Sequence, residues 1–251
     1  MLLLGGEAAW LANRLAGSGT TWGFVGWGLV PALIVLALLT NGKRLAWPAQ
    51  RFAADYLGIG VTVPLLCLTG WVLLATVRAG DPTPLPYLPL LNPLELGQSF
   101  ILLLLGHWLL QIRQARIPAV DGVSEQIMAA LLAALTFIAV NGVVARAVHF
   151  IGDVPFRPWS LWRSNILQAA IAILWTTLAL SLTILATRTG RRQVWLTGAG
   201  LLGLVVAKLF LVDLAGQGTV ARIVSFLVVG GLMLVIGYFS PLPPRQLEEK
   251  Q

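Results

Sequence analysis

The fold is decided by residues 21–40, which read TWGFVGWGLVPALIVLALLT and contain no charged side chain. A helix of about 20 apolar residues is long enough to cross the roughly 30 Å hydrocarbon core of a bilayer. Further apolar runs of similar length follow at about 52–77, 94–112, 124–151, 160–187, 194–214 and 220–239. The sequence therefore predicts a membrane protein with about seven crossings.

The composition excludes a water-soluble protein. Only 11% of the residues are charged and 57% are hydrophobic, whereas about a quarter of the residues in a soluble domain are charged. The apolar runs are continuous rather than alternating, which excludes a transmembrane barrel. We therefore predict an all-α, polytopic transmembrane helix bundle that forms a single domain over residues 1–251. A short interfacial or truncated helix at 1–16 precedes the first crossing.

A proline-rich segment separates the second and third predicted crossings. Residues 81–93 read DPTPLPYLPLLNP, with five prolines within twelve residues, and this density of proline is incompatible with a helix. The segment is nevertheless apolar. We expect it to form a structured strap at the membrane surface.

The basic residues predict the orientation of the chain. Ten lie beside the loops on one side: Lys43, Arg44, Arg51, Arg113, Arg116, Arg188, Arg191, Arg192, Arg245 and Lys250. The other side has five: Arg14, Arg78, Arg157, Arg163 and Arg222. The positive-inside rule places the first side and the C-terminus in the cytoplasm and the strap outside. The net charge of +7 thus reflects topology, and we expect no binding of nucleic acid. An N-terminus outside the cell suggests further helices upstream in a longer parent chain.

Ionisable groups inside apolar runs are costly and therefore mark candidate binding or functional residues. Arg146, His149 and Asp153 share one helical face by their spacing, near the predicted outer boundary. The other candidates at that level are Lys208, Asp213, Arg222, Ser225, Asn92 and Glu95. We expect a polar cluster there. Each member also has a structural interpretation: Lys208 can extend to the interface or pair with Asp213, Asp213 can pair with Arg222, and His149 can be a packing residue.

The sequence gives no support for a metal, a cofactor or a known catalytic motif. Its two histidines are far apart, and a single cysteine, Cys67, excludes both a disulfide and a multi-cysteine metal site. We expect Cys67 to be buried and inert. Nucleophile, nucleotide-binding and zinc-peptidase motifs are absent from the sequence.

The C-terminal third carries specific motifs. The run Lys208-Leu-Phe-Leu-Val-Asp213 is followed by Ala221-Arg-Ile-Val-Ser-Phe226 and then by Gly237-Tyr-Phe-Ser-Pro-Leu-Pro-Pro244. With the strap and the helix of Asn141 and Arg146, these motifs resemble the bacterial multi-pass membrane proteins of domain-of-unknown-function family 2339. The resemblance covers roughly residues 82–244. It implies a location in the bacterial inner membrane and a chain that corresponds to the C-terminal portion of longer proteins, and it supplies no catalytic residues.

Three functions remain open. The first is handling or transport of a lipid, a lipid-linked compound or a small anion at the outer leaflet, where basic residues suit an anionic headgroup. The second is a structural scaffold of a membrane complex, and the third is an envelope enzyme with Glu95, Asp153 or Asp213 as acid or base. The expected partners are membrane lipids and either upstream helices or other membrane subunits. A continuous groove beside the charged residues would favour lipid handling, and a dry, fully paired cluster would favour the scaffold.

Overall fold

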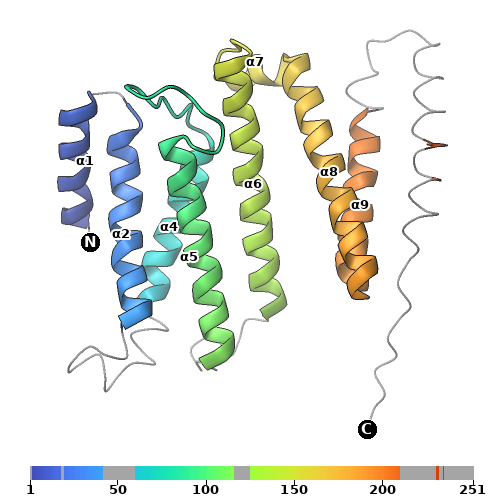
Figure 1. Ribbon diagram of the computed structural model, residues 1–251, viewed down its shortest axis with the longest axis horizontal. Helices are drawn as coiled ribbons and strands as arrows, with labels where there is room; N and C mark the ends of the chain where they lie inside the picture. Colours follow the sequence, from blue (N-terminus) through green and yellow to red (C-terminus); the bar gives the residue numbers. More distant parts are fainter. Residues whose placement is uncertain are drawn as a thin grey trace. The chain divides into compact units, whose positions relative to one another are not determined.

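The computed structural model describes residues 2–17, 20–41, 60–115 and 125–209, together with the isolated positions 230, 231 and 234. Over these ranges the chain is helical and contains no strand, which confirms the predicted all-α bundle (Figure 1). The helices are α1 (Leu2–Ala16), α2 (Trp22–Asn41), α4 (Val61–Thr76), α5 (Pro93–Ala115), α6 (Glu125–Ile151), α7 (Pro158–Arg163), α8 (Asn165–Thr189) and α9 (Arg192–Lys208).

Four of the described helices are long and apolar enough to cross a membrane, namely α2, α5, α6 and α8. The helix α4 is apolar and has 16 residues, and residues 52–59 of the predicted run 52–77 lie outside the described residues. Most of the seventh predicted run, 220–239, also lies outside them. The number of seven crossings therefore stays a prediction.

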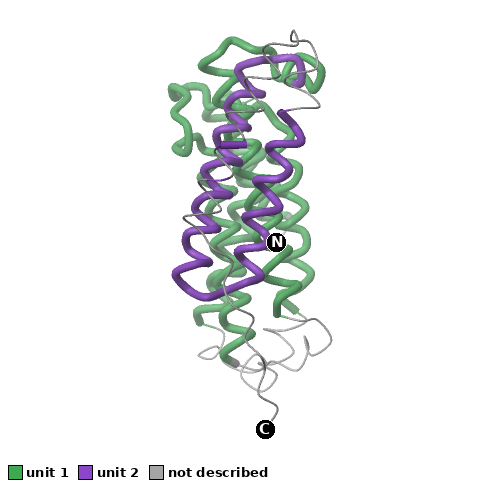
Figure 2. Tube along the Cα trace, turned by 90° about the vertical axis from the view of Figure 1, so that its right-hand side faces the viewer, with its two compact units in different colours: residues 1–161 green, residues 162–251 purple. Residues whose placement is uncertain are grey.

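The chain divides into two compact units, residues 1–161 and 162–251 (Figure 2), and the predicted single domain stays a prediction. The first unit contains α1, α2, α4, α5 and α6, and the second contains α8 and α9.

The predicted fifth crossing, 160–187, is interrupted close to its start. Ser160 belongs to the short helix α7, and α8 begins only after Ser164. The Ser164 hydroxyl accepts a hydrogen bond from the amide of Leu167 at 3.3 Å, so Ser164 is the N-cap of α8. At the other end, Gly190 adopts a positive φ of 66°, which glycine accommodates without steric cost.

Trp71 of α4 occupies the centre of the first unit. Its side chain is 8% exposed, its Nε1 donates to the carbonyl of Phe24 on α2 at 3.0 Å, and its ring stacks on that of Phe24 with centroids 4.9 Å apart. A Cβ atom on Gly28 would lie 2.4 Å from the indole, and one on Gly97 would lie 3.2 Å from it. Glycines on α2 and α5 thus provide the space in which the indole packs.

The segment between α4 and α5 is non-helical, as the proline spacing predicts, and it lies across one end of the first unit (Figure 1). The amide of Thr21 donates to the carbonyl of Asp81 at 3.1 Å, and Trp22 Nε1 donates to the carbonyl of Thr83 at 3.0 Å. The hydroxyl and the amide of Thr83 both donate to the Asp81 carboxylate. These two bonds, the hydroxyl bond more than the amide bond, lower the pKa of Asp81. The strap, which spans residues 77–92 between the two helices where the sequence predicted 81–93, is therefore attached to the start of α2.

In the described part of the second unit, α8 and α9 pack closely against each other. A Cβ atom on Gly198 of α9 would lie 2.8 Å from Thr183 Cγ2 and 3.0 Å from the carbonyl of Ala179, both on α8. Close approach of the two backbones thus depends on a glycine at this position.

The expectation that Cys67 is buried is wrong, since this residue of α4 is exposed. Its neighbours Leu65 and Leu68 are each 2% exposed and occupy the packed face of α4. Helical geometry then directs the side chain of Cys67 away from the core.

Candidate functional site

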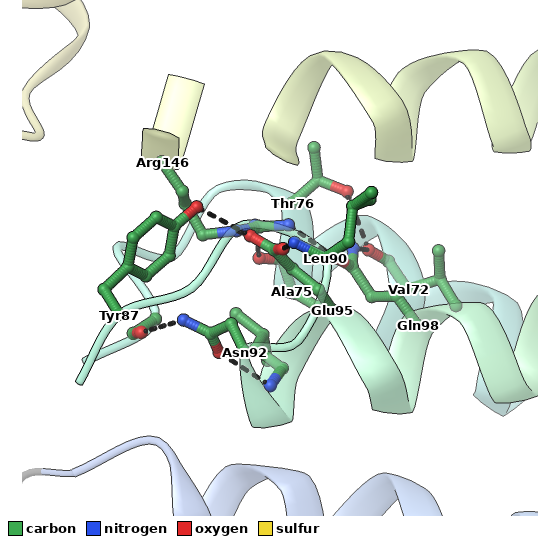
Figure 3. A network of polar contacts seen from close by, with 11 residues as sticks. Val72, Ala75, Thr76, Tyr87, Leu90, Asn92, Glu95, Gln98 and Arg146 are labelled. Carbon is green, nitrogen blue, oxygen red and sulfur yellow. Dashed lines mark hydrogen bonds and ion pairs between the residues drawn. The ribbon is translucent and has the colours of Figure 1, made fainter. Parts of the chain in front are cut away.

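The most deeply buried charge in the described chain belongs to Arg146 of α6, whose side chain is 0% exposed. Its Nε lies 3.0 Å from Oε1 of Glu95, and the Glu95 side chain is 1% exposed. Burying either charge alone would cost several kcal/mol, so the two require each other. Figure 3 shows the two side chains meeting between α6 and the start of α5.

The other two guanidinium nitrogens also have acceptors. Nη1 of Arg146 donates to the carbonyl of Ala75 at 3.2 Å, and Nη2 donates to Oε1 of Gln98 at 2.7 Å. Gln98 in turn donates through Nε2 to the Val72 carbonyl and to Oγ1 of Thr76, each at 3.1 Å. One arginine therefore connects α6 to both α4 and α5 (Figure 3).

The strap completes the coordination of the Glu95 carboxylate. The hydroxyl of Tyr87 donates to Oε1 at 3.0 Å and the amide of Leu90 donates to Oε2 at 2.5 Å. Burial and then the negative charge of Glu95 raise the pKa of Tyr87 above its usual value, which keeps the phenol protonated as a donor. The Tyr87 ring also stacks on Phe150 of α6, with centroids 4.3 Å apart.

Asn92 begins α5 and binds the strap to it. Its Oδ1 accepts a hydrogen bond from the amide of Leu94 at 2.9 Å, and its Nδ2 donates to the carbonyl of Gly80 at 2.7 Å. Gly80 has a φ of +75°, and a Cβ atom there would lie 3.0 Å from Cδ of Arg146. Both the backbone angle and the space beside Arg146 therefore favour glycine.

Replacement of Asn92 by alanine is expected to lower the free energy of unfolding by about 1–3 kcal/mol. The change removes an N-cap and leaves the buried Gly80 carbonyl without its donor. Thermal unfolding of the purified protein in detergent measures the loss. The Asn92→Ser variant keeps a cap acceptor and loses the amide donor without adding a charge, so its loss should be smaller. Equal stability of wild type and Asn92→Ala would contradict this assignment.

The structure brings together three of the nine predicted site residues, namely Asn92, Glu95 and Arg146. The prediction that Arg146, His149 and Asp153 share one helical face is wrong for Asp153. The helix α6 ends at Ile151, and Asp153 follows in an exposed loop with a φ of 51°. The shared face predicted from the spacing required the helix to continue to residue 153.

His149 lies outside the charged network. Its Nδ1 is 2.7 Å from the carbonyl of Val154, and its ring contacts those of Phe150 and Phe156 at centroid distances of 4.6 and 5.6 Å. This environment matches the interpretation of His149 as a hydrogen-bonded packing residue.

The remaining candidates belong to the second unit. Lys208 is part-buried, and its Nζ donates to the carbonyl of Gln168 on α8 at 3.2 Å. Asp213, Arg222 and Ser225 lie outside the described residues. Pairing of Asp213 with Lys208 or Arg222 thus stays a prediction.

Sequence reasoning missed Tyr87, Gln98 and Thr76, which complete the network. Gln98 follows Glu95 by three residues on α5, so helical spacing already places it on the face of the acid. Tyr87 had no such signal, because its contact with Glu95 depends on the path of a non-helical strap.

The network is buried and its hydrogen bonds are satisfied. Among the described buried side chains, every nitrogen and oxygen atom has a hydrogen-bond partner. The three Arg146 nitrogens are directed to protein acceptors, and both Glu95 oxygens accept from protein donors. No group of three or more potential metal ligands occurs among the described residues. The arrangement can therefore fix three helices and the strap in one register.

A separate apolar groove of about 640 Å³ runs between α4, α5 and α6. Its lining residues are Thr62, Leu66, Thr69, Leu73, Leu105, Trp108, Leu109, Met128, Leu131, Leu132, Ala134, Leu135 and Ile138. On α5 and α6 these residues lie in the halves of the helices farthest from the strap. The groove and the Arg146 network thus occupy different levels of the same unit.

Comparison with known proteins gives one finding. The family model described as "Predicted membrane protein (DUF2339)" matches residues 1–243. No curated protein and no solved structure matches the chain.

Proposed function

Because the chain belongs to the DUF2339 family of predicted membrane proteins, we propose that this integral membrane protein handles a lipid whose acyl chain lies in the groove between α4, α5 and α6. The groove is the observation that carries the proposal. Its volume of about 640 Å³ falls within the usual range of ligand sites, about 300–1,000 Å³.

The lining of the groove supports a lipid tail rather than a headgroup. It contains no charged residue, and the hydroxyl of its Thr69 donates to the carbonyl of Leu65 on the same helix. Leu66 and Leu131, on α4 and α6, line the groove and are 65% and 64% exposed, so the groove is open to its surroundings. An apolar chain can occupy this space without desolvating a polar group.

The position of the groove indicates in which leaflet the lipid tail lies. The basic residues led us to expect an anionic headgroup at the outer leaflet, but Arg146 directs its nitrogens to Glu95, Gln98 and Ala75. If the strap is outside, as the charge count predicts, the groove opens toward the inner leaflet. The proposal therefore concerns the lipid tail in that leaflet.

Filling the groove is expected to displace the lipid. An Ala134→Phe variant should retain about tenfold less lipid than wild type, since an extra ring in an occupied site typically costs 1–3 kcal/mol. Mass spectrometry of lipids that remain with the protein after purification in native nanodiscs measures the change. Ala133 is also exposed and does not line the groove, so Ala133→Phe is the matched control. Equal lipid content in both variants would rule out the proposal.

A structural scaffold is the second candidate, and the buried, fully paired Glu95–Arg146 network supports it. A membrane subunit that only fixes the register of helices for other chains needs buried, paired charges and no accessible ones. In that case Ala134→Phe would leave lipid content unchanged, while variants of the network would disrupt assembly of the complex. The envelope-enzyme alternative gains no support from Glu95, since both its oxygens already accept hydrogen bonds.

The location in the bacterial inner membrane and the cytoplasmic C-terminus are also proposals, supported by the distribution of basic residues. In a Cys67→Ala background, Thr189→Cys is expected to react with an impermeant thiol reagent only after the cells are opened. Asp153→Cys should react in intact cells. Labelling of position 189 from outside would show that the topology is the opposite of the proposed one.

A further inference from the structure

The outer face of α1 is apolar, exposed and interrupted by a carboxylate. The residues of this face are exposed and recur with the spacing of helical turns: Leu3, Leu4, Glu7, Trp10, Leu11, Arg14 and Leu15. Leu3 and Leu15 are 86% and 79% exposed. Such a continuous face on a helix is suited to contact with lipid or with another helix.

The contacts of the opposite face of α1 with α2 show at which level of α2 Glu7 lies. The helix α1 packs tightly along α2, since a Cβ atom on Gly26 would lie 3.1 Å from the amide nitrogen of Ala9. Asn13 lies beside Gly23, close to the start of α2. Glu7 is six residues from Asn13 along α1, a distance of about 9 Å at 1.5 Å per residue. The carboxylate is therefore well below the end of the membrane-spanning helix α2.

Glu7 has no hydrogen bond or ion pair with the described part of the chain. It is exposed, with Leu3, Leu4, Trp10 and Leu11 around it. The cation on the same face, Arg14, lies 5.1 Å from the centroid of the Trp10 ring, and no ion pair joins it to Glu7. An ionisable group at such a depth in hydrocarbon is costly unless it is paired.

We propose that the outer face of α1 docks a membrane-spanning helix of another polypeptide, which presents a lysine or arginine to Glu7. The apolar residues on either side supply the packing surface, and the carboxylate selects a partner with a basic residue at its depth. The α1 faces of two copies of the chain do not pair with each other. In one membrane both copies have the same orientation, so two α1 faces in contact would bring Glu7 close to Glu7. This surface is separate from the groove, and the inference does not depend on lipid handling.

Site-directed cross-linking tests the interface. A photoreactive residue at position 11, one turn from Glu7 on the same face, is expected to capture a second membrane protein in intact membranes. The mapped peptide should be a membrane helix that contains lysine or arginine. The same residue at position 103 of α5, where Leu103 is 74% exposed, controls for nonspecific capture. Glu7→Leu should lower the yield at position 11 by about 3- to 30-fold, the size of a polar contact between membrane helices.

Two further measurements separate docking from folding. The melting temperature of purified Glu7→Leu should equal that of wild type, because Glu7 has no hydrogen bond or ion pair with a described residue. A Glu7→Lys variant should lose the cross-link, and an acidic substitution of the partner's basic residue should restore it. Three outcomes would overturn the proposal: products that contain only this chain or lipid, a captured helix without a basic residue, or an unchanged yield in Glu7→Leu.

Discussion

Replacement of Arg146 by methionine is expected to lower the free energy of unfolding by about 3–5 kcal/mol, the usual cost of breaking a buried ion pair from one side. The variant leaves Glu95 as a buried charge that retains only Tyr87 and Leu90 as donors. It also leaves Oε1 of Gln98 without its partner. Denaturant unfolding in detergent micelles, followed by tryptophan fluorescence, measures the loss.

The double variant Glu95→Leu/Arg146→Met is the control for this prediction. With both charges removed, the desolvation penalty disappears along with the pair, so much of the lost stability should return. If the single and the double variant were equally unstable, the loss would come from packing rather than from an unpaired charge. If Arg146→Met were as stable as wild type, the network would not stabilise the fold.

Replacement of Trp71 by alanine is expected to cost about 3–5 kcal/mol, as is typical when a large aromatic side chain is removed from a core. The indole fills the space left by Gly28 and Gly97 and stacks on Phe24. Its removal therefore leaves a cavity between α2, α4 and α5. Thermal unfolding in detergent, followed by circular dichroism, measures the loss.

Trp159→Ala is the matched control, since the same side chain is 66% exposed there. We expect it to change stability by less than about 0.5 kcal/mol, the usual limit for surface substitutions. A small loss in Trp71→Ala, equal to that of the control, would show that the indole is not part of the core.

The sequence predicted the helices because long apolar runs admit few other structures in lipid. It also identified Asn92, Glu95 and Arg146, since a polar group in an apolar run needs a partner. It did not predict how they are paired. The contact of Glu95 with Tyr87 and the fit of Gly80 against Arg146 depend on the path of the strap, which hydrophobic periodicity does not describe.

Local signals at helix ends were harder to interpret. Gly152 ends the helix before Asp153, although the spacing from Arg146 suggested a continuous face. The predicted run began at Ser160, between Trp159 and Leu161, whereas α8 begins after Ser164, which lies between Arg163 and Asn165. Single residues decide such boundaries, and helix periodicity cannot distinguish them.

The order of residues in the network has a consequence for insertion during synthesis. Tyr87 and Leu90 lie eight and five residues before Glu95, so the donors for the acid leave the ribosome just ahead of it. Arg146 follows 51 residues later. The strap and the start of α5 can thus shelter the carboxylate while the nascent chain is still being made. The guanidinium then enters a site whose acceptors already exist, and until it arrives the carboxylate has only the donors that precede it in the chain.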